Sequence, residues 1–194
     1  MKLKELIFEN VEQVRQWRNK CFEALRTPFL LTKEMQEQFY KDVICNRNAH
    51  ARYWGVWETK TPDAADDMLE TFQDLFKPYD YFIGMVGLEN IEWENRRSEI
   101  SIILNPEYRG KGYGEQAVDM LLEQGFMYLN LDNIWGICYY CNPAFEFWKK
   151  IIQKHYAFSI ELPSQKFWKG QYYFGLYFNI SKEEWIKCRK EHVQ

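Results

Sequence analysis

The fold is decided by residues 105–117, which read NPEYRGKGYGEQA. This stretch joins a predicted strand at residues 97–104 (RSEISIIL) to a predicted helix at residues 112–129, so three glycines and two cations lie at a strand-to-helix junction. Glycines let successive backbone N–H groups point inward, and a helix N-terminus carries a partial positive charge. The junction is therefore a candidate phosphate-binding site, although a helix-entry turn alone would also explain Gly110 and Gly114.

Two common nucleotide-binding motifs do not fit the spacing. A Walker A loop requires Lys and then Ser or Thr after its last glycine, but Tyr113 follows Gly112. A dinucleotide fingerprint requires the pattern GxGxxG, whereas Gly110, Gly112 and Gly114 form GxGxG. Both alternatives are excluded.

The same stretch resembles motif A of the GCN5-related N-acetyltransferases, [QR]-x-x-G-x-[GA], which Arg109, Gly112 and Gly114 match. In that family the loop holds the pyrophosphate of CoA. The resemblance extends over about residues 82–150. The segment VRQWRN at 14–19 is similar to the first helix of the subgroup with ribosomal-protein, spermidine and sugar-nucleotide acetyltransferases. The resemblance implies an acetyl-CoA-dependent N-acetyltransferase.

The resemblance also implies an α/β (α+β) architecture, the GNAT fold. We expect a mixed, mostly antiparallel, twisted sheet of six to seven strands, an N-terminal helix pair, and a central splayed pair of parallel strands. The pantetheine arm of CoA would lie between these two strands, where unpaired backbone groups need a partner. The residues implied in CoA binding are Ile102, Ile103, Leu104, Arg109, Gly110, Lys111, Gly112, Tyr113, Gly114, Asn142 and Trp148.

Transfer of an acetyl group to an amine requires a base for the amine, donors for the oxyanion and a proton for the departing thiolate. Glu99 is our candidate base, followed by Glu89 and Glu92, although a strand glutamate is often only a solvated outer-face residue. A backbone N–H near Ile103 or Leu104 would serve the oxyanion.

The proton donor is where the chain departs from the family pattern, Asn-x-x-Ala-x-x-[Leu/Phe]-Tyr. With Ala144 aligned, Trp148 stands at the tyrosine position and Cys141 at the asparagine position; a shift by one restores Asn142. An indole N–H donates a hydrogen bond but is no practical acid. Tyr139, Tyr140 or water must substitute, and we select Tyr140.

Composition limits the other possibilities. The chain has 194 residues with 46% hydrophobic content, so we expect one domain over residues 1–194. With 25 basic and 28 acidic residues, it offers no general attraction for nucleic acid. The five cysteines show no second metal-ligand cluster, so no metal is expected. We find neither a signal peptide nor a spanning segment, which favours no membrane contact and a cytoplasmic location.

The patterns outside the glycine loop agree with the expected α/β fold. The first helix is amphipathic, and Thr32 is the predicted N-cap of the second helix. An aromatic last strand could pair along an exposed edge in a homodimer. The expected elements are helices at 11–25, 32–46, 112–129 and 143–154, and strands at 51–58, 81–88, 97–104, 133–140 and 172–180.

The acceptor amine is not identified by the sequence. A polyamine, an amino sugar or sugar nucleotide, an aminoglycoside and a protein N-terminus all remain open. The insertion between the first and second expected strands carries Asp63, Asp66, Asp67 and Glu70, which could attract a polyamine or could simply be a solvated loop. The alternative from another class is a catalytically inactive acyl-CoA-binding sensor or scaffold.

Overall fold

The computed structural model describes residues 1–21, 25–26, 28–61 and 78–191. Over these ranges, seven strands form one mixed sheet in the order β1-β2-β3-β4-β5-β7-β6. All neighbouring strands are antiparallel except β4 and β5. The expected α/β fold with a mostly antiparallel sheet is confirmed. The strands are β1 (Lys2–Lys4), β2 (Arg52–Lys60), β3 (Tyr79–Glu92), β4 (Arg97–Leu104), β5 (Asn133–Tyr139), β6 (Phe158–Trp168) and β7 (Gln171–Ser181).

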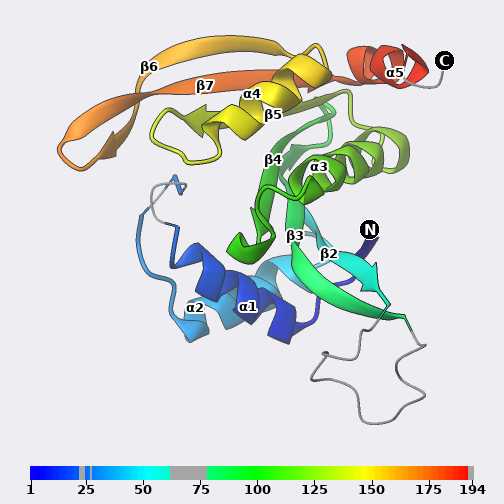
Figure 1. The fold of residues 1–194 in the computed structure, drawn as a ribbon, viewed down its shortest axis with the longest axis vertical. Coiled ribbons are helices and arrows are strands. Elements are labelled where there is room, and N and C mark those ends of the chain that lie inside the picture. Colours follow the sequence, from blue (N-terminus) through cyan, green and yellow to red (C-terminus); the bar gives the residue numbers. More distant parts are fainter. Residues whose placement is uncertain (22–24, 27, 62–77, 192–194) are drawn as a thin grey trace.

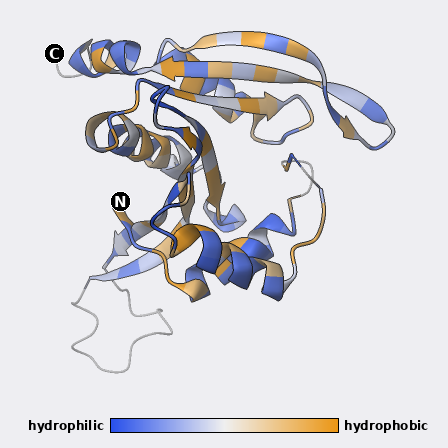
Figure 2. Ribbon diagram, turned by 180° about the vertical axis from the view of Figure 1, so that it is seen from behind, coloured by the Kyte–Doolittle hydropathy of each residue, from blue (hydrophilic) through white to orange (hydrophobic). Residues whose placement is uncertain are grey.

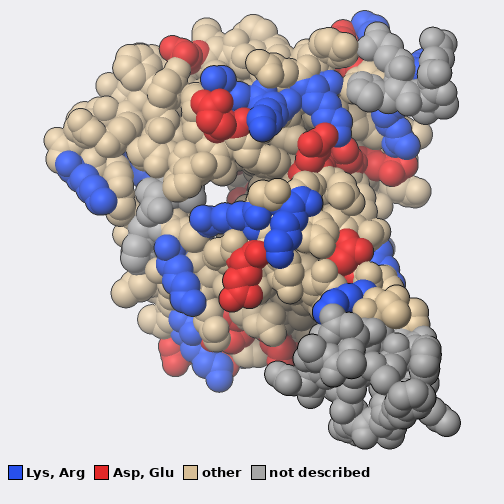
Figure 3. All heavy atoms as spheres, viewed as in Figure 1, with Lys and Arg blue, Asp and Glu red and all other residues tan. Residues whose placement is uncertain are grey.

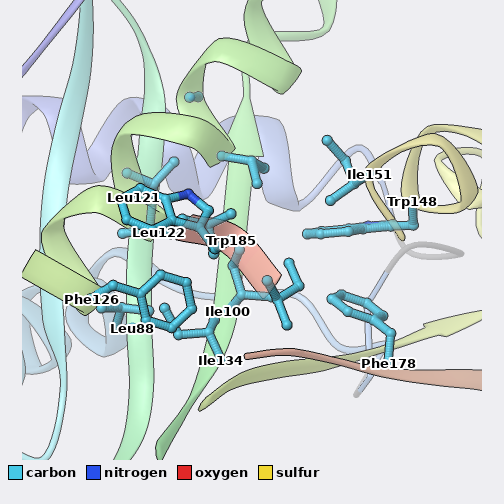
Figure 4. Close-up of a cluster of buried hydrophobic side chains, with 14 of the residues drawn as sticks. Leu88, Ile100, Leu121, Leu122, Phe126, Ile134, Trp148, Ile151, Phe178 and Trp185 are labelled. Atoms are coloured by element: carbon cyan, nitrogen blue, oxygen red, sulfur yellow. The ribbon is translucent and has the colours of Figure 1, made fainter. Parts of the chain in front are cut away.

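The helices pack on the sheet in two groups. Figure 1 shows α1 and α2 together, away from α4, β6 and β7. The larger core lies under α3, α4 and α5, and Figure 4 shows part of it, including Leu121 and Phe126. A smaller core joins α1 to the inner strands through Val11, Val14 and Met85. The helices are α1 (Phe8–Arg18), α2 (Lys33–Phe39), α3 (Tyr113–Glu123), α4 (Phe145–Lys154) and α5 (Lys182–Glu191).

The N-terminal helix pair is confirmed, with different ends. The α1 helix ends at Arg18 rather than near residue 25, because the backbone turns at Asn19, whose side chain bonds to the backbone of Leu31. The Thr32 hydroxyl caps α2 by accepting from the N–H of Met35 at 3.2 Å. A π-helical turn, η2 (Tyr40–Ile44), extends α2 almost to the expected end.

The two inner helices also differ at their ends from the sequence expectation. A π-helical turn, η5 (Gln124–Tyr128), completes α3, and a short 3-10 turn, η4 (Pro106–Tyr108), precedes it. The α4 helix begins at Phe145, two residues after Pro143. None of the described helices is both long and apolar enough to cross a membrane.

The C-terminal part contains elements that the sequence analysis missed, namely β6 and α5. Because β6 pairs with β7, the expectation that the last aromatic strand offers an exposed edge is wrong: β7 lies between β5 and β6. Polar and apolar residues alternate along both strands of this hairpin (Figure 2). The acidic insertion with Asp63, Asp66, Asp67 and Glu70 lies outside the described residues.

Candidate active site

The loop between β4 and α3 has the backbone that an anion site requires. Gly110 and Gly112 adopt φ values of 75° and 81°, in the left-handed region that other residues rarely enter. A Cβ atom built on either glycine would meet nothing within 4 Å, so open space lies beside the loop. Gly112 is also the N-cap of α3, an 11-residue helix whose first N–H groups have no helical acceptor. Open space, available donors and a helix N-terminus together suit a phosphate group.

Three tyrosines support this loop. Tyr108 packs edge-on against Tyr113 at 5.9 Å, and Tyr81 lies 5.6 Å from Tyr108. Burial is the main cause that raises the pKa of Tyr81, so its hydroxyl stays protonated at neutral pH. On the other side of the loop, a Cβ on Gly114 would come within 3.0 Å of the Phe147 ring of α4. Gly114 therefore allows close helix packing, whereas Gly110 and Gly112 shape the loop.

Two cations flank the loop. Arg109 is exposed and its guanidinium donates to the Cys21 sulfur at 3.1 Å, and the Lys111 ammonium lies 5.2 Å from the Tyr108 ring centre. In Figure 3 an opening is visible in the middle of this face of the molecule, with Lys and Arg side chains beside it. A polyanion entering here would meet positive charge.

The splayed strand pair is present. Strands β4 and β5 pair only from Arg97 opposite Asn133 to Glu99 opposite Trp135, and no pairing follows between the rest of β4 and β5. A wedge therefore opens in the sheet beyond Glu99. The unpaired groups along it cost free energy unless a ligand with amide groups meets them.

The register of β3 and β4 decides which backbone groups face the wedge. The Asn105 N–H donates to the Ile83 carbonyl at 2.9 Å, and hydrogen bonding alternates along an antiparallel pair. Ile103 is therefore bonded toward β3, while the backbone groups of Ile102 and Leu104 point into the wedge. This geometry suits the predicted roles of Ile102 and Leu104, and it leaves their N–H groups, rather than that of Ile103, to serve the oxyanion.

Glu99 lies where the two strands separate, and it is only 7% exposed. The Arg26 guanidinium forms a salt bridge with one carboxylate oxygen, and Asn90 donates to the other at 3.0 Å. Burial works to lower the pKa of Arg26, but the charge of Glu99 and hydrogen bonds to Glu99 and Tyr139 raise it above its ordinary value. Glu99 is thus a buried carboxylate rather than a solvated strand residue.

A second carboxylate lies beside Glu99. Glu89 on β3 is directly opposite Glu99 on β4, and directly opposite residues have their side chains on the same face of a sheet. The Tyr53 hydroxyl bonds to Glu89; burial, helped by this carboxylate, raises the pKa of Tyr53 well above its ordinary range. This face of β4 is the one covered by α1, since Ile103 packs against the smaller core. Two carboxylates therefore face the α1 side of the wedge.

Of the other candidates, Trp148 lies in the larger core. It is 9% exposed, and its ring packs at 5.0 Å on Phe178, as Figure 4 shows. Tyr140 is exposed; its hydroxyl donates to the Glu161 carboxylate, and this bond raises the pKa of Tyr140. The Asn142 side chain accepts from the Ala144 N–H at 2.8 Å in the turn before α4.

The sequence analysis missed a set of contacts that crosses the wedge on its α1 side. The Lys166 ammonium of β6 donates to the Leu25 carbonyl at 2.7 Å and lies 5.2 Å from the ring centres of Tyr139 and Trp168. The next residue, Arg26, forms a salt bridge with Glu99. These partners are separated by 73 and 141 positions in the chain, so no local pattern could reveal them.

A mixed sheet that splays beside a glycine loop and helix N-terminus defines a class of enzymes that bind an acyl-CoA thioester. The family model described as "Acetyltransferase (GNAT) domain" matches residues 3–146. The chain belongs to this family, and it is an N-acetyltransferase.

Curated relatives and solved structures agree with the family. An uncharacterized N-acetyltransferase of Bacillus subtilis is 31% identical over 121 residues, which are 61% of this chain and 68% of the relative. The spermidine N(1)-acetyltransferase of Escherichia coli K12 is 27% identical over 81% of this chain and 87% of its own. The structure of a Vibrio cholerae spermidine N-acetyltransferase with CoA and spermine has a TM-score of 0.71 at 19% identity, covering 95% of this chain and 97% of that chain.

Proposed function

We propose that this chain transfers the acetyl group of acetyl-CoA directly to a primary amine of a polyamine, without a metal. The similarity to spermidine N(1)-acetyltransferase over most of both chains supports this substrate class. The observation that carries the proposal is the pair of carboxylates, Glu89 and Glu99, on the α1 side of the wedge. Alkylammonium groups are compact cations that such a pair attracts strongly when it is partly shielded from water.

The loop between β4 and α3, residues 105–112, is called the CoA loop in this proposal, because its left-handed glycines leave open space beside a helix N-terminus where acetyl-CoA would bind. In this proposal the N–H groups that follow Gly112 hold the pyrophosphate, with Arg109 and Lys111 as flanking charges. Tyr113 and Gly110 shape the loop.

The wedge would receive the pantetheine arm, whose amides pair with the backbone of Ile102 and Leu104. Asn142 retains a side-chain amide that could donate to the same arm. Trp148 would contribute indirectly, by fixing α4 on the sheet.

Glu99 would act as the base, directly or through water. Its bonds to Arg26 and Asn90 fix the direction of the carboxylate. An ammonium substrate brings donors of its own, so it can replace part of the contact that Arg26 makes with Glu99. The amine is nucleophilic only after it has lost a proton to Glu99 or to water, and the neutral amine then attacks the thioester.

Release of free thiol from acetyl-CoA tests the proposal. The panel contains spermidine, spermine, an amino sugar, an aminoglycoside and a short peptide with a free N-terminus. The loop control is the double variant Arg109→Glu, Gly112→Asp, which should lose CoA binding. The carboxylate test is Glu99→Gln, with Glu92→Gln as its matched control, because Glu92 pairs with Arg97 in an exposed hairpin.

We expect release with the polyamines, a loss of about 100-fold in kcat for Glu99→Gln, and little change for Glu92→Gln. Release with only the amino sugar or the peptide would replace the polyamine by that substrate. Binding of CoA in calorimetry with no release from any amine would favour the acyl-CoA sensor.

A further inference from the structure

Two side chains donate to the carboxylate of Glu99, and they differ in how the fold supports them. Arg26 comes from the connection between α1 and α2, and its side chain is 54% exposed. Asn90 comes from β3, and its amide donates to the other carboxylate oxygen at 3.0 Å. We propose that Asn90 is a positioning residue, which keeps the Glu99 carboxylate in place when the amine replaces Arg26. This inference rests on the acetyl transfer and the base proposed above.

A β-bulge brings Asn90 to this position. Strand β3 has two residues, 90–91, opposite the single residue Ser98 of β4, so the register shifts after Glu89. Asn90 has a φ of 50°, in the left-handed region that asparagine tolerates better than most residues. The Ser98 hydroxyl donates to the Glu89 carbonyl at 2.7 Å inside the bulge. Bulges of this kind redirect a side chain and are frequent beside active sites.

The bulge puts two consecutive side chains on the α1 face of the sheet. Leu88 and Ile91 both lie in the larger core, although residues three positions apart in a regular strand point to opposite faces. The two residues between them face the other way: Glu89 is opposite Glu99, and the Asn90 amide bonds to the Glu99 carboxylate. In a regular strand, Asn90 would point to the core side and could not make this bond.

The backbone beside Asn90 is also tied to the chain before β2. The Ile91 N–H donates to the His50 carbonyl at 2.9 Å, and Nδ1 of the His50 ring donates to the Ile91 carbonyl at 3.0 Å. Together with the Ser98 hydroxyl, these bonds fix the chain on both sides of Asn90. The amide is therefore preorganised to hold the base.

The chemistry of the amide suits this role. A carboxylate only accepts hydrogen bonds, so Nδ2 of Asn90, and not its oxygen, must face Glu99. The amide is neutral, so it adds no positive charge that would repel an incoming ammonium group. In the part of the chain that the structure describes, Arg26 and Asn90 are the only side chains that bond to this carboxylate. When the amine replaces Arg26, Asn90 is the donor that remains.

A purely conformational role for Asn90 makes a different prediction. Left-handed positions favour asparagine and glycine whatever the side chain bonds to. Asn130 is a matched control, because it is also exposed, has a φ of 56°, and its side-chain oxygen accepts from Arg96 at 2.8 Å. It precedes β5, at the end where β4 and β5 are paired. Replacement of either asparagine by glycine keeps the left-handed backbone and removes one side-chain hydrogen bond.

The test is steady-state thiol release from acetyl-CoA with spermidine at pH 8 in Asn90→Gly, Asn90→Asp and Asn130→Gly. A misplacement of reacting groups by about 1 Å can cost about 100-fold in rate. We expect Asn90→Gly to lose about tenfold or more in kcat, with KM for acetyl-CoA unchanged and KM for spermidine within about threefold, because the two carboxylates remain. Asn130→Gly should stay within about twofold of the unchanged protein in kcat and should have a similar unfolding midpoint to Asn90→Gly.

Asn90→Asp is the second variant, and it decides the matter if glycine loosens the bulge. Aspartate has the shape of asparagine and tolerates the left-handed backbone, but at pH 8 it is ionised and cannot donate to Glu99. We expect kcat to fall at least as far as in Asn90→Gly. Full activity of both variants would mean that Asn90 serves only the backbone, and it would overturn the proposal.

The variant Glu99→Gln shows whether Asn90 acts through the base. When Glu99 is already replaced, Asn90→Gly should change the remaining kcat by less than about twofold, since no base is left to position. A further loss of about tenfold would mean that Asn90 acts independently of Glu99, and it would also overturn the proposal.

Failure of the proposed function gives different results, which appear before any Asn90 variant is compared. Full activity of Glu99→Gln would reject the base and, with it, the residue that positions the base. The absence of thiol release with every amine of the panel in the unchanged protein would reject both proposals. Loss of activity in Glu99→Gln with full activity in Asn90→Gly and Asn90→Asp would reject only the role of Asn90. If another amine of the panel is the substrate, the same variants are compared with that amine.

Discussion

The left-handed glycines of the CoA loop allow a quantitative test, because the chain contains a matched control. Gly112 (φ 81°) and Gly170 (φ 84°) have nearly the same backbone conformation, and a Cβ atom on either would meet nothing within 4 Å. Replacement by alanine therefore adds only the cost of a left-handed L-residue, about 1–2 kcal/mol. For a chain of this length, that lowers Tm by about 2–8 °C. Gly112→Ala and Gly170→Ala should both show this decrease in Tm.

The two variants should differ in the presence of CoA. Gly170 lies in the turn between β6 and β7, whereas Gly112 is the N-cap of α3. We expect Gly112→Ala to weaken CoA binding about tenfold, since its Cβ enters the space beside the loop. At a CoA concentration of about 100 times the original Kd, bound CoA stabilises the Gly170→Ala variant by about 2.7 kcal/mol and the Gly112→Ala variant by only about 1.4 kcal/mol.

Thermal unfolding with and without CoA measures both quantities on the same samples. Equal stabilisation of the two variants by CoA would refute the assignment of the loop to the pyrophosphate. Unchanged stability of both variants without CoA would instead refute the cost assigned to the left-handed backbone.

Burial works to raise the pKa of Asp119, but hydrogen bonds from two basic residues at the end of α4 lower it. The stabilisation from the ionised Asp119 is therefore present above about pH 4 and is lost as the pH falls through the folded pKa. In urea unfolding, Asp119→Asn should lower the unfolding free energy by about 1 kcal/mol at pH 7 and by little at pH 2. An equal loss at the two pH values would contradict this. Trp148→Ala removes a core ring packed on Phe178 and should lower the unfolding free energy by about 3–5 kcal/mol; a loss below about 1 kcal/mol would mean the ring is not in the core. Burial raises the pKa of Cys138 to about 12, so iodoacetamide at pH 8 should label the exposed Cys45 and spare Cys138, as peptide mass mapping can check.

Much of the fold follows from local patterns in the sequence. The strand at 97–104 ends before Pro106, the glycines begin the next helix, and Thr32 caps α2, because each depends on residues a few positions apart. The β6 strand was missed because Pro163 and the left-handed Ser164 (φ 53°) interrupt it and shift its register against β7.

The conformation of the glycine loop and the surroundings of Glu99 were predictable to different degrees. The loop conformation is encoded in consecutive residues, so Gly110 and Gly112 could be identified from the sequence alone. The environment of Glu99 depends on Arg26, which is 73 positions away. The hydrogen-bond partner of Tyr140 is Glu161 of β6, which is 21 positions away. No single-sequence pattern contains these tertiary contacts.

The position of Glu99 at the start of the wedge places the proposed base and the proposed CoA loop on different faces of the sheet. Successive residues of a strand point to opposite faces, so Ile100 joins the core under α3 while Glu99 faces α1. The CoA loop at the N-terminus of α3 continues from the same strand, and the carboxylates point to the other side. In the proposed mechanism, the amine approaches from the α1 face while the thioester enters through the wedge.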